Sequence, residues 1–171
     1  MSRTAFLRLL FVLGMSAAAT VSLAADEATV KAAYLYNFAK FIQWPDEQRA
    51  ALRLCIIGDD ALGQPLHSLI GKPVRNMQIS VRHGVAVHDI PQCDLVFVPA
   101  DHAQSLERVR QVVNGYPILI VAESSDAMPK GAMVALIQSD GRIVFEVDLA
   151  VTRRLGFQVS AKMLQLARKV Y

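Results

Sequence analysis

The chain has 171 residues, and its 18 Lys and Arg against 15 Asp and Glu give a formal net charge of +3. The basic residues form no run that would suit a nucleic-acid groove, so we expect no nucleic-acid partner. The length predicts a single domain that is large enough to bury a hydrophobic core.

The first 25 residues have the layout of a secretory signal peptide. Arg3 and Arg8 form a short basic start, an apolar run follows over 9–19, and small residues close the stretch. The apolar run is shorter than the roughly 20 residues that a membrane-spanning helix needs. We therefore predict an exported protein, with an uncleaved membrane anchor as the alternative.

The small residues at the end of this stretch place the cleavage site. Ser22 and Ala24 suit the −3 and −1 positions of a signal peptidase site. Cleavage after Ala24 or Ala25 removes the signal peptide, 1–24, and leaves a single mature domain, 25–171. Loss of the two arginines lowers the net charge to about +1. No second apolar stretch is long enough to span a membrane.

The mature chain opens with a segment of helical periodicity, DEATVKAAYLYNFAKFIQWP. Its apolar residues share one stripe of a helix, and Pro45 ends that helix. The stripe contains Val30, Ala33, Tyr34, Phe38, Phe41 and Ile42. A stripe so rich in aromatic residues packs either against the interior of the domain or against a partner docked on a partly exposed face.

Short apolar runs alternate with helical segments in the next part of the chain. The sequence predicts helices over 60–70 and 102–114. It predicts buried strands over 53–58, 76–81, 94–98 and 116–122. This alternation is typical of a largely parallel sheet with helices on both faces.

The pattern changes toward the C-terminus. Two apolar runs, 133–137 and 142–147, flank a Ser-Asp-Gly turn at 139–141, which is a strong signal for an antiparallel hairpin. A last helix begins after Ser160, which can cap it, and continues to Tyr171. We therefore predict an α/β domain of three layers, with a mixed, mainly parallel sheet and an antiparallel hairpin at one end.

Two cysteines, Cys55 and Cys93, lie in or next to predicted strands. An even number of cysteines in an exported chain favours a disulfide, whereas two buried free thiols would be the better interpretation in the cytosol. If the two strands are neighbours, the bond closes a loop of about 39 residues and stabilises the fold by about 4 kcal/mol. The pair could also act as a redox-sensitive switch, although no CxxC motif indicates thioredoxin chemistry.

The chain carries none of the common catalytic or cofactor motifs. The GDDALG loop after the first strand has neither the lysine-hydroxyl ending of a P-loop nor GxGxxG spacing, and no GxSxG nucleophile motif occurs. The four histidines lack the spacing of a zinc site. We therefore expect a non-enzymatic protein that has no catalytic residues, no metal and no cofactor.

One set of polar residues allows a ligand site. Asp59, Asp101 and Ser124 follow three of the predicted strands. In open α/β sheets, ligands bind in the crevice at the carboxyl ends of the strands. The alternative function is therefore a small-molecule sensor module whose ligand contacts Asp59, Asp101 and Ser124.

Four segments of the mature chain together carry a family resemblance: KAAYLYNFAKFIQWP, RLCIIGDDALG, CDLVFVP and RRLGFQVSAKMLQLARKVY. They resemble the YfiR/HmsC-like family of bacterial periplasmic proteins. The resemblance implies a non-catalytic regulator that binds the periplasmic sensor region of an inner-membrane diguanylate cyclase and holds it inactive. Release of that cyclase would raise cyclic di-GMP and promote biofilm formation.

The same resemblance implies a homodimer and a periplasmic location. Cys55 and Cys93 match a cysteine pair of the family, whereas a second pair found in some relatives is missing here. For the partner-binding surface we expect apolar burial on the aromatic N-terminal helix, with two arginines at a polar rim. The residues of this surface are Tyr34, Phe38, Phe41, Trp44, Arg153 and Arg154.

Overall fold

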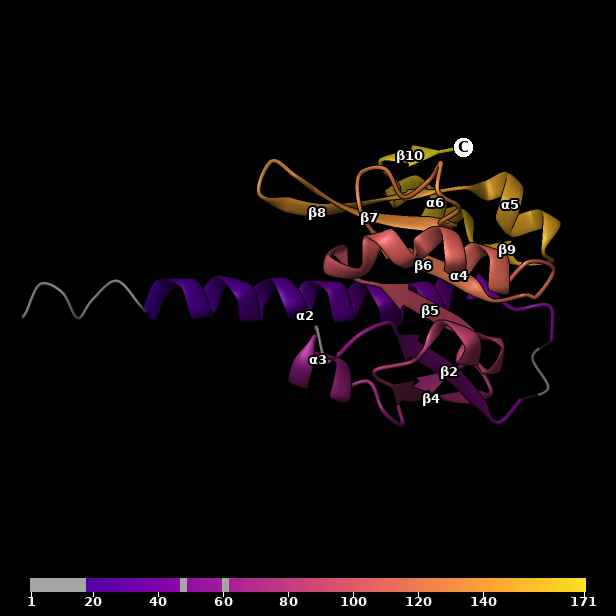
Figure 1. Ribbon diagram of the computed structural model, residues 1–171, viewed down its shortest axis with the longest axis horizontal. Coiled ribbons are helices and arrows are strands. Elements are labelled where there is room, and N and C mark those ends of the chain that lie inside the picture. Colours follow the sequence, from indigo (N-terminus) through magenta and orange to yellow (C-terminus); the bar gives the residue numbers. More distant parts are fainter. Residues whose placement is uncertain (1–17, 47–48, 60–61) are drawn as a thin grey trace, which may run out of the picture.

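In the computed structural model, side chains are described from Glu27 onward, and the described backbone covers residues 18–46, 49–59 and 62–171. Most of the predicted signal peptide, residues 1–17, lies outside the described residues, so its cleavage stays a prediction. The first described element is the long helix α2 (Ala18–Phe41), which runs through the expected cleavage sites and projects beyond the sheet in Figure 1. Among the described helices, none is both long and apolar enough to cross a membrane.

The centre of the fold is one mixed sheet of eight strands. Its strands follow in the order β10 (Lys169–Val170), β8 (Arg142–Val147), β7 (Val134–Ser139), β6 (Leu119–Glu123), β5 (Leu95–Val98), β2 (Ala51–Ile56), β4 (Met77–Arg82) and β3 (Pro73–Val74). The five strands from β7 to β4 are parallel to one another. β8 and β3 are antiparallel to their inner neighbours, and β10 is parallel to β8.

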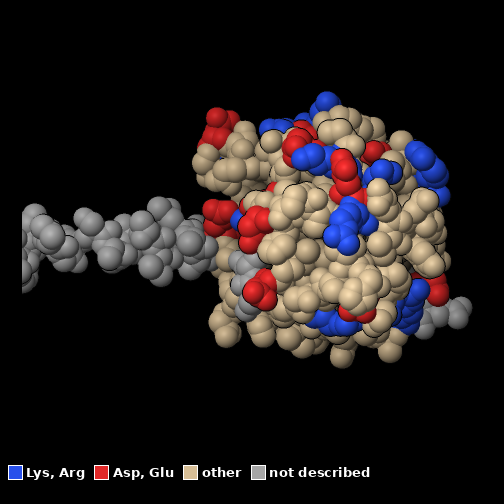
Figure 2. Space-filling model, viewed as in Figure 1, with Lys and Arg blue, Asp and Glu red and all other residues tan. Residues whose placement is uncertain are grey.

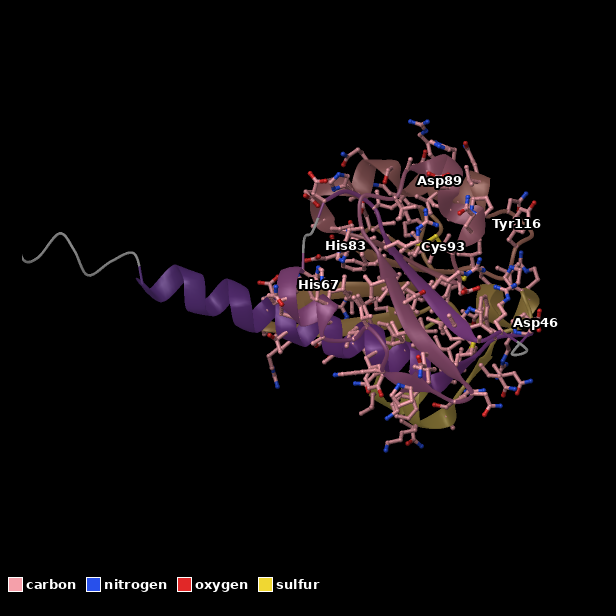
Figure 3. The ribbon with its side chains drawn as sticks, turned by 90° about the horizontal axis from the view of Figure 1, so that it is seen from below. Asp46, His67, His83, Asp89, Cys93 and Tyr116 are labelled. Carbon is pink, nitrogen blue, oxygen red and sulfur yellow. A yellow bond between two sulfur atoms is a disulfide. The ribbon has the colours of Figure 1, made fainter. Side chains whose placement is uncertain are left out.

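Helices cover both faces of this sheet, so the predicted three-layer α/β architecture is confirmed. Figures 1 and 3 show α2 on one face and α4 (Leu106–Val112) on the other. Two 3-10 helices, η1 (Val87–Gln92) and η2 (Ala100–Ser105), contact α4, whereas α3 (Gly63–His67) and α6 (Ala161–Leu166) contact α2. Because both faces are covered, every residue of β5 is buried.

The predicted hairpin is present, and β8 has the predicted bounds. β7 and β8 pair antiparallel up to Ser139 and Arg142, so two residues form the turn. These residues, Asp140 and Gly141, have φ angles of 50° and 72°. Positive φ at both positions is the requirement of the two-residue turn that matches strand twist, and an Asp-Gly pair adopts it readily.

The predicted C-terminal helix is correct at its start and wrong at its end. Ser160 caps α6, because its hydroxyl accepts a hydrogen bond from the backbone N–H of Met163 at 3.2 Å. The helix ends at Leu166, and Ala167 is already extended, with ψ of 137°. The last residues instead form β10, because the outer edge of β8 offers them backbone partners.

Other predicted helices are shorter than expected, and one was missed. The segment predicted as a helix over 102–114 starts as the 3-10 helix η2 and becomes α-helical only at Leu106. The helix predicted over 60–70 is reduced to α3 in its described part. The missed helix is α5 (Leu149–Arg154), which Asp148 caps by accepting a hydrogen bond from Val151 N at 2.8 Å.

A disulfide joins Cys55 and Cys93, as predicted, with an S–S distance of 1.99 Å and a Cα–Cα distance of 6.0 Å. Cys55 lies in β2, and Cys93 lies two residues before β5, which is the neighbouring parallel strand. Both residues are buried, and Figure 3 shows Cys93 inside the body of the domain. The bond therefore closes its loop at the centre of the sheet.

Candidate partner-binding surface

The aromatic residues expected to dock a partner lie mostly inside the domain. Phe38 is 1% exposed, and its ring centroid lies 5.2 Å from that of Phe145 in β8. Tyr34 is half-buried, and its hydroxyl donates a hydrogen bond to the carbonyl of Ile143 at 2.9 Å. These two residues fasten α2 to the hairpin. The expectation that Phe38 offers a contact surface is therefore corrected, because its side chain is used in the core.

Trp44 requires the same correction. Its side chain is 5% exposed, and its ring packs edge-on against Phe157 with centroids 5.7 Å apart. The indole N–H donates to the carbonyl of Asp94 at 3.0 Å. Trp44 thus connects the segment after α2 with β5 and with the segment before α6. Helical and aromatic patterns in the sequence did not distinguish this internal role from an external one.

Of the other predicted residues, Arg153 and Arg154 are exposed and Phe41 is partly accessible, as Tyr34 is. Phe41 is half-buried at the end of α2, and Lys162 Nζ lies 5.7 Å from its ring centroid. Arg153 and Arg154 are exposed in the last turn of α5. We call Phe41, Arg153, Arg154 and Lys162 the end surface.

A small second sheet brings the parts of the end surface to one end of the molecule. The strand β1 (Ile42–Gln43) follows Phe41 and pairs antiparallel with β9 (Gln158–Val159). The backbone N–H of Ser160 donates to the carbonyl of Phe41 at 2.9 Å. Gly156 follows α5 and packs against Pro45 so closely that an added Cβ would lie 3.1 Å from Pro45 Cβ. Residues more than 100 positions apart in the sequence therefore meet here.

The end surface is basic. None of Arg153, Arg154 and Lys162 forms an ion pair with a residue in the described part of the chain. Figure 2 shows mainly acidic side chains at the opposite end, whereas basic side chains lie over the rest of the visible face with some acidic ones among them. Three cations without an ion pair in the described chain, one of them beside a half-buried aromatic ring, fit an acidic surface with an apolar centre.

The expected ligand residues lie at that opposite end, but the structure does not bring them into one site. Asp101 lines a hollow of about 310 Å³ with Lys31 and Glu123, whereas Asp59 and Ser124 do not line it. Asp101 pairs with His102 Nδ1 at 3.0 Å. The Ser124 hydroxyl is hydrogen-bonded to Asp126.

Lys31 dominates the electrostatics of this hollow. Its Nζ lies 2.6 Å from carboxylate oxygens of both Glu27 and Glu123. Burial disfavours the charged amine, but the hydrogen bonds to Glu123 and Glu27 outweigh it, so the pKa of Lys31 is raised. Glu123 at the end of β6 and Glu27 of α2 thus neutralise Lys31, which makes Glu123 a poor candidate for holding a ligand.

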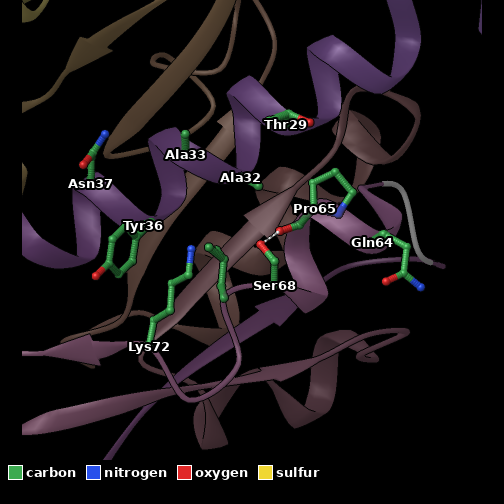
Figure 4. A pocket seen from close by; sticks show the side chains of 10 residues that line it. Thr29, Ala32, Ala33, Tyr36, Asn37, Gln64, Pro65, Ser68 and Lys72 are labelled. Atoms are coloured by element: carbon green, nitrogen blue, oxygen red, sulfur yellow. Dashed lines mark hydrogen bonds between the residues drawn. The ribbon is translucent and has the colours of Figure 1, made fainter. Parts of the chain in front are cut away.

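A groove between α2 and α3 was not predicted (Figure 4). It has a volume of about 720 Å³. Tyr36 stands at one end, with Lys40 Nζ and Lys72 Nζ at 5.4 and 5.3 Å from its ring centroid. The sequence did hold a signal, because Thr29, Ala33 and Asn37 recur every four residues and so share one face of the helix. All three are exposed, although Ala33 was assigned to the apolar stripe.

The described residues hold no cluster of three or more His, Cys, Asp or Glu that could bind a metal ion. Two histidines nevertheless lie together, since the rings of His67 and His83 stack with centroids 5.0 Å apart and an interplanar angle of 15°. Figure 3 shows both near α3, and His83 directly follows β4.

Comparison with known families identifies the fold. The model of the YfiR/HmsC-like family matches residues 28–168. This chain belongs to the YfiR/HmsC-like family. The matched range of this YfiR/HmsC-like protein contains Phe41, both cysteines, both arginines of the end surface and Lys162. No curated protein matches the chain.

Two solved structures resemble this YfiR/HmsC-like protein in fold. A conserved domain protein from Vibrio cholerae O1 biovar El Tor has a TM-score of 0.55 and 8% identity, over 82% of this chain and 60% of that one. An ABC domain from Streptococcus pneumoniae in complex with L-Trp has a TM-score of 0.51 and 9% identity, over 70% of this chain and 55% of that one. The chain therefore spans less than two thirds of either protein, and identities this low establish the shared fold alone.

Proposed function

We propose that this protein is a periplasmic repressor of an inner-membrane diguanylate cyclase. It binds the periplasmic sensor region of the cyclase, holds the enzyme inactive, and so lowers cyclic di-GMP and biofilm formation. The observation that carries this proposal is the match of the YfiR/HmsC-like family to residues 28–168. The buried disulfide agrees with an oxidising compartment such as the periplasm.

Such a repressor acts by preferring one conformation of its partner. A protein that bound the active and inactive conformations of the sensor region equally well would leave the equilibrium between them unchanged, however tight the binding. Moving a cyclase from nearly all active to nearly all inactive requires a preference of about 10⁴-fold. The contact surface must therefore recognise a feature that only the inactive conformation presents.

The end surface is our candidate for this contact. Phe41 and Tyr34 are the half-buried aromatic residues of the predicted set, but the Tyr34 hydroxyl is bonded within the domain. Aromatic residues and arginines are typical centres of binding energy at protein interfaces. Arg153, Arg154 and Lys162 form a positive rim that would steer an acidic partner toward Phe41. We further expect the repressor to be a homodimer, which light scattering on the purified protein measures directly.

The experiment that tests this function uses two readouts. Isothermal titration calorimetry with the purified sensor region of a membrane diguanylate cyclase from the same organism measures binding. Cyclic di-GMP in cells that lack the gene measures repression, and complementation with the intact gene should restore the low level. If no such sensor region binds and deletion leaves cyclic di-GMP unchanged, the proposed function is wrong.

A further inference from the structure

A further pocket lies between α4, α5 and the loop that precedes β7, and we call it the α4–α5 pocket. Its volume of about 390 Å³ falls within the range of roughly 300–1,000 Å³ that is usual for ligand sites. Figure 1 shows α4 and α5 toward the same end of the molecule. Apolar side chains form its walls: Val113, Ile120, Met128, Met133, Val151 and Leu155.

Two arginines, Arg110 of α4 and Arg154 of α5, also line the pocket. Both side chains are exposed, and neither is ion-paired with any residue that the structure describes. The carboxylate of Asp148 also lines the pocket. It caps α5 by accepting a hydrogen bond from Val151 N. The pocket thus combines apolar walls with a net positive charge, because two arginines and one carboxylate line it.

Arg110 packs against Gly131. An added Cβ at Gly131 would lie only 2.0 Å from Cδ of Arg110 and 2.7 Å from its Cγ. Gly131 also has a φ of 102°, a conformation that residues with a side chain rarely adopt. The aliphatic part of Arg110 therefore covers the Gly131 backbone, and its guanidinium is held at the pocket.

We propose that the α4–α5 pocket binds a small organic anion. The apolar body of the ligand fills the pocket, and its carboxylate or phosphate accepts hydrogen bonds from Arg110 and Arg154. The pocket lies beside Gly115 and Met133, which precede β6 and β7. It is therefore near the amino ends of these parallel strands. Asp59, Asp101 and Ser124 lie at the other end of the sheet, because they follow their strands.

Arg154 belongs both to this pocket and to the end surface. A bound anion would neutralise Arg154 and so weaken the attraction of the end surface for an acidic partner. This consequence rests on the proposed function, whereas binding of the anion itself does not. The test therefore uses the protein without its partner, so that failure of the pocket and failure of the proposed function are separate results.

The experiment is calorimetric titration of the mature chain with octanoate, octyl phosphate, 1-octanol and inorganic phosphate. We expect saturable binding of at least one of the two amphiphilic anions, and their ratio distinguishes a carboxylate from a phosphate site. The uncharged 1-octanol and the bare phosphate should each bind at least tenfold more weakly. Absence of binding by both amphiphilic anions, or equal binding of 1-octanol, would overturn the proposal.

Variants locate the site. Arg110→Gln and Arg154→Gln should each weaken binding of the anion by about tenfold to a hundredfold, the usual value of a charge-assisted hydrogen bond. Arg108→Gln in α4 and Arg153→Gln in α5 remove exposed arginines that do not line the pocket, so they should retain wild-type affinity. Circular dichroism checks that all four variants fold. If the two pocket variants bind as tightly as the two controls, the assignment of the site is wrong.

Discussion

The guanidinium of Arg168 holds the buried carboxylate of Glu146, with Nε and Nη2 donating to Oε1 at 3.1 and 2.6 Å. The hydroxyl of Tyr171 donates to Oε2 of the same group at 2.9 Å. Glu146 is 5% exposed, so these bonds replace the water that the carboxylate would have in the unfolded chain. They also anchor β10, and with it the C-terminal residues, to β8.

The first prediction concerns stability in acid. Burial favours the neutral form of Glu146, but hydrogen bonds from Arg168 and Tyr171 outweigh burial, so its pKa is lowered. A lowered pKa in the folded state stabilises the fold above the unfolded value of about 4.3, and this stabilisation is lost as the pH falls through the folded pKa. Urea denaturation between about pH 6 and pH 3 should therefore show a falling free energy of unfolding.

Glu146→Gln tests the cause of that slope. At neutral pH the variant should lose about 1–3 kcal/mol, because Arg168 loses its charged acceptor. The difference from the wild type should shrink as the pH falls through the lowered pKa of Glu146 in the folded state, because the wild-type carboxyl then becomes neutral as well. Glu107→Gln, an exposed position in α4, is the control and should follow the wild type. A constant difference across the pH range would contradict this role of Glu146.

The second prediction concerns the disulfide. Replacing Cys55 and Cys93 by Ser should lower the free energy of unfolding by about 4 kcal/mol, since the unfolded chain regains the freedom of a loop of about 39 residues. Chemical reduction of the wild type should produce a loss of the same size in urea denaturation. If the reduced protein remains folded and keeps its affinity for the cyclase sensor region, the bond is structural and the redox-switch alternative fails.

The sequence alone predicts an element correctly where the residues that determine that element are close together in the chain. The hairpin depends on Asp140 and Gly141 alone, because their positive φ angles specify the turn. The end of α6 depends on distant residues. Ala167 and Val170 continue a helical apolar stripe, which predicts a longer helix. The segment instead pairs with β8 and contacts Glu146, more than 20 positions upstream.

The candidate site was predicted only in part, for a related reason. Periodicity placed Phe38 and Phe41 on a single stripe of α2, but it contains no information on which part of that stripe the sheet covers. Phe38 packs against Phe145 of the hairpin, whereas Phe41 is the last residue of α2 and is only partly buried. The α4–α5 pocket could not be predicted, because Arg110, Gly131 and Arg154 lie on separate elements that only the tertiary fold brings together.

The third prediction compares the contributions of Phe41 and Trp44 to stability. Trp44→Ala should cost about 3–5 kcal/mol of stability, because it leaves a cavity beside Phe157 and a lost hydrogen bond at Asp94. Phe41→Ala should cost about 1 kcal/mol, since its ring is already partly exposed. Thermal denaturation measures both. Comparable losses of stability would mean that Phe41 is a core residue rather than a surface anchor.

The fourth prediction is that Phe41 contributes more to binding of the cyclase sensor region than to stability. Phe41→Ala should weaken binding by tenfold or more while the fold is retained, as expected for an aromatic anchor. Tyr116→Ala removes an aromatic residue that is 53% exposed outside the end surface, so it is the matched control and should bind normally. Equal affinity of the two variants would place the partner elsewhere on the domain.

The last prediction concerns Asp94, whose carboxylate lies at the start of β5 next to the disulfide. It is 3% exposed and accepts hydrogen bonds from Arg53 N at 2.8 Å and Arg53 Nε at 2.9 Å, and Arg49 also pairs with it. The hydrogen bond to Asp94 raises the pKa of Arg53 against the effect of burial. Asp94→Asn keeps the shape but removes the charge, so it should lower the free energy of unfolding by about 2–3 kcal/mol.

Asp101→Asn is the control for this substitution, because Asp101 is an exposed aspartate that pairs with one histidine. It should change stability by less than about 0.5 kcal/mol. Urea denaturation at neutral pH compares the two variants. High salt should reduce the loss of stability in Asp94→Asn only slightly, because salt screens a buried carboxylate less than an exposed one. A loss at Asp94 no greater than that at Asp101 would mean that Arg49 and Arg53 contribute nothing measurable here, and that the amino end of β5 is held by Trp44 and the disulfide alone.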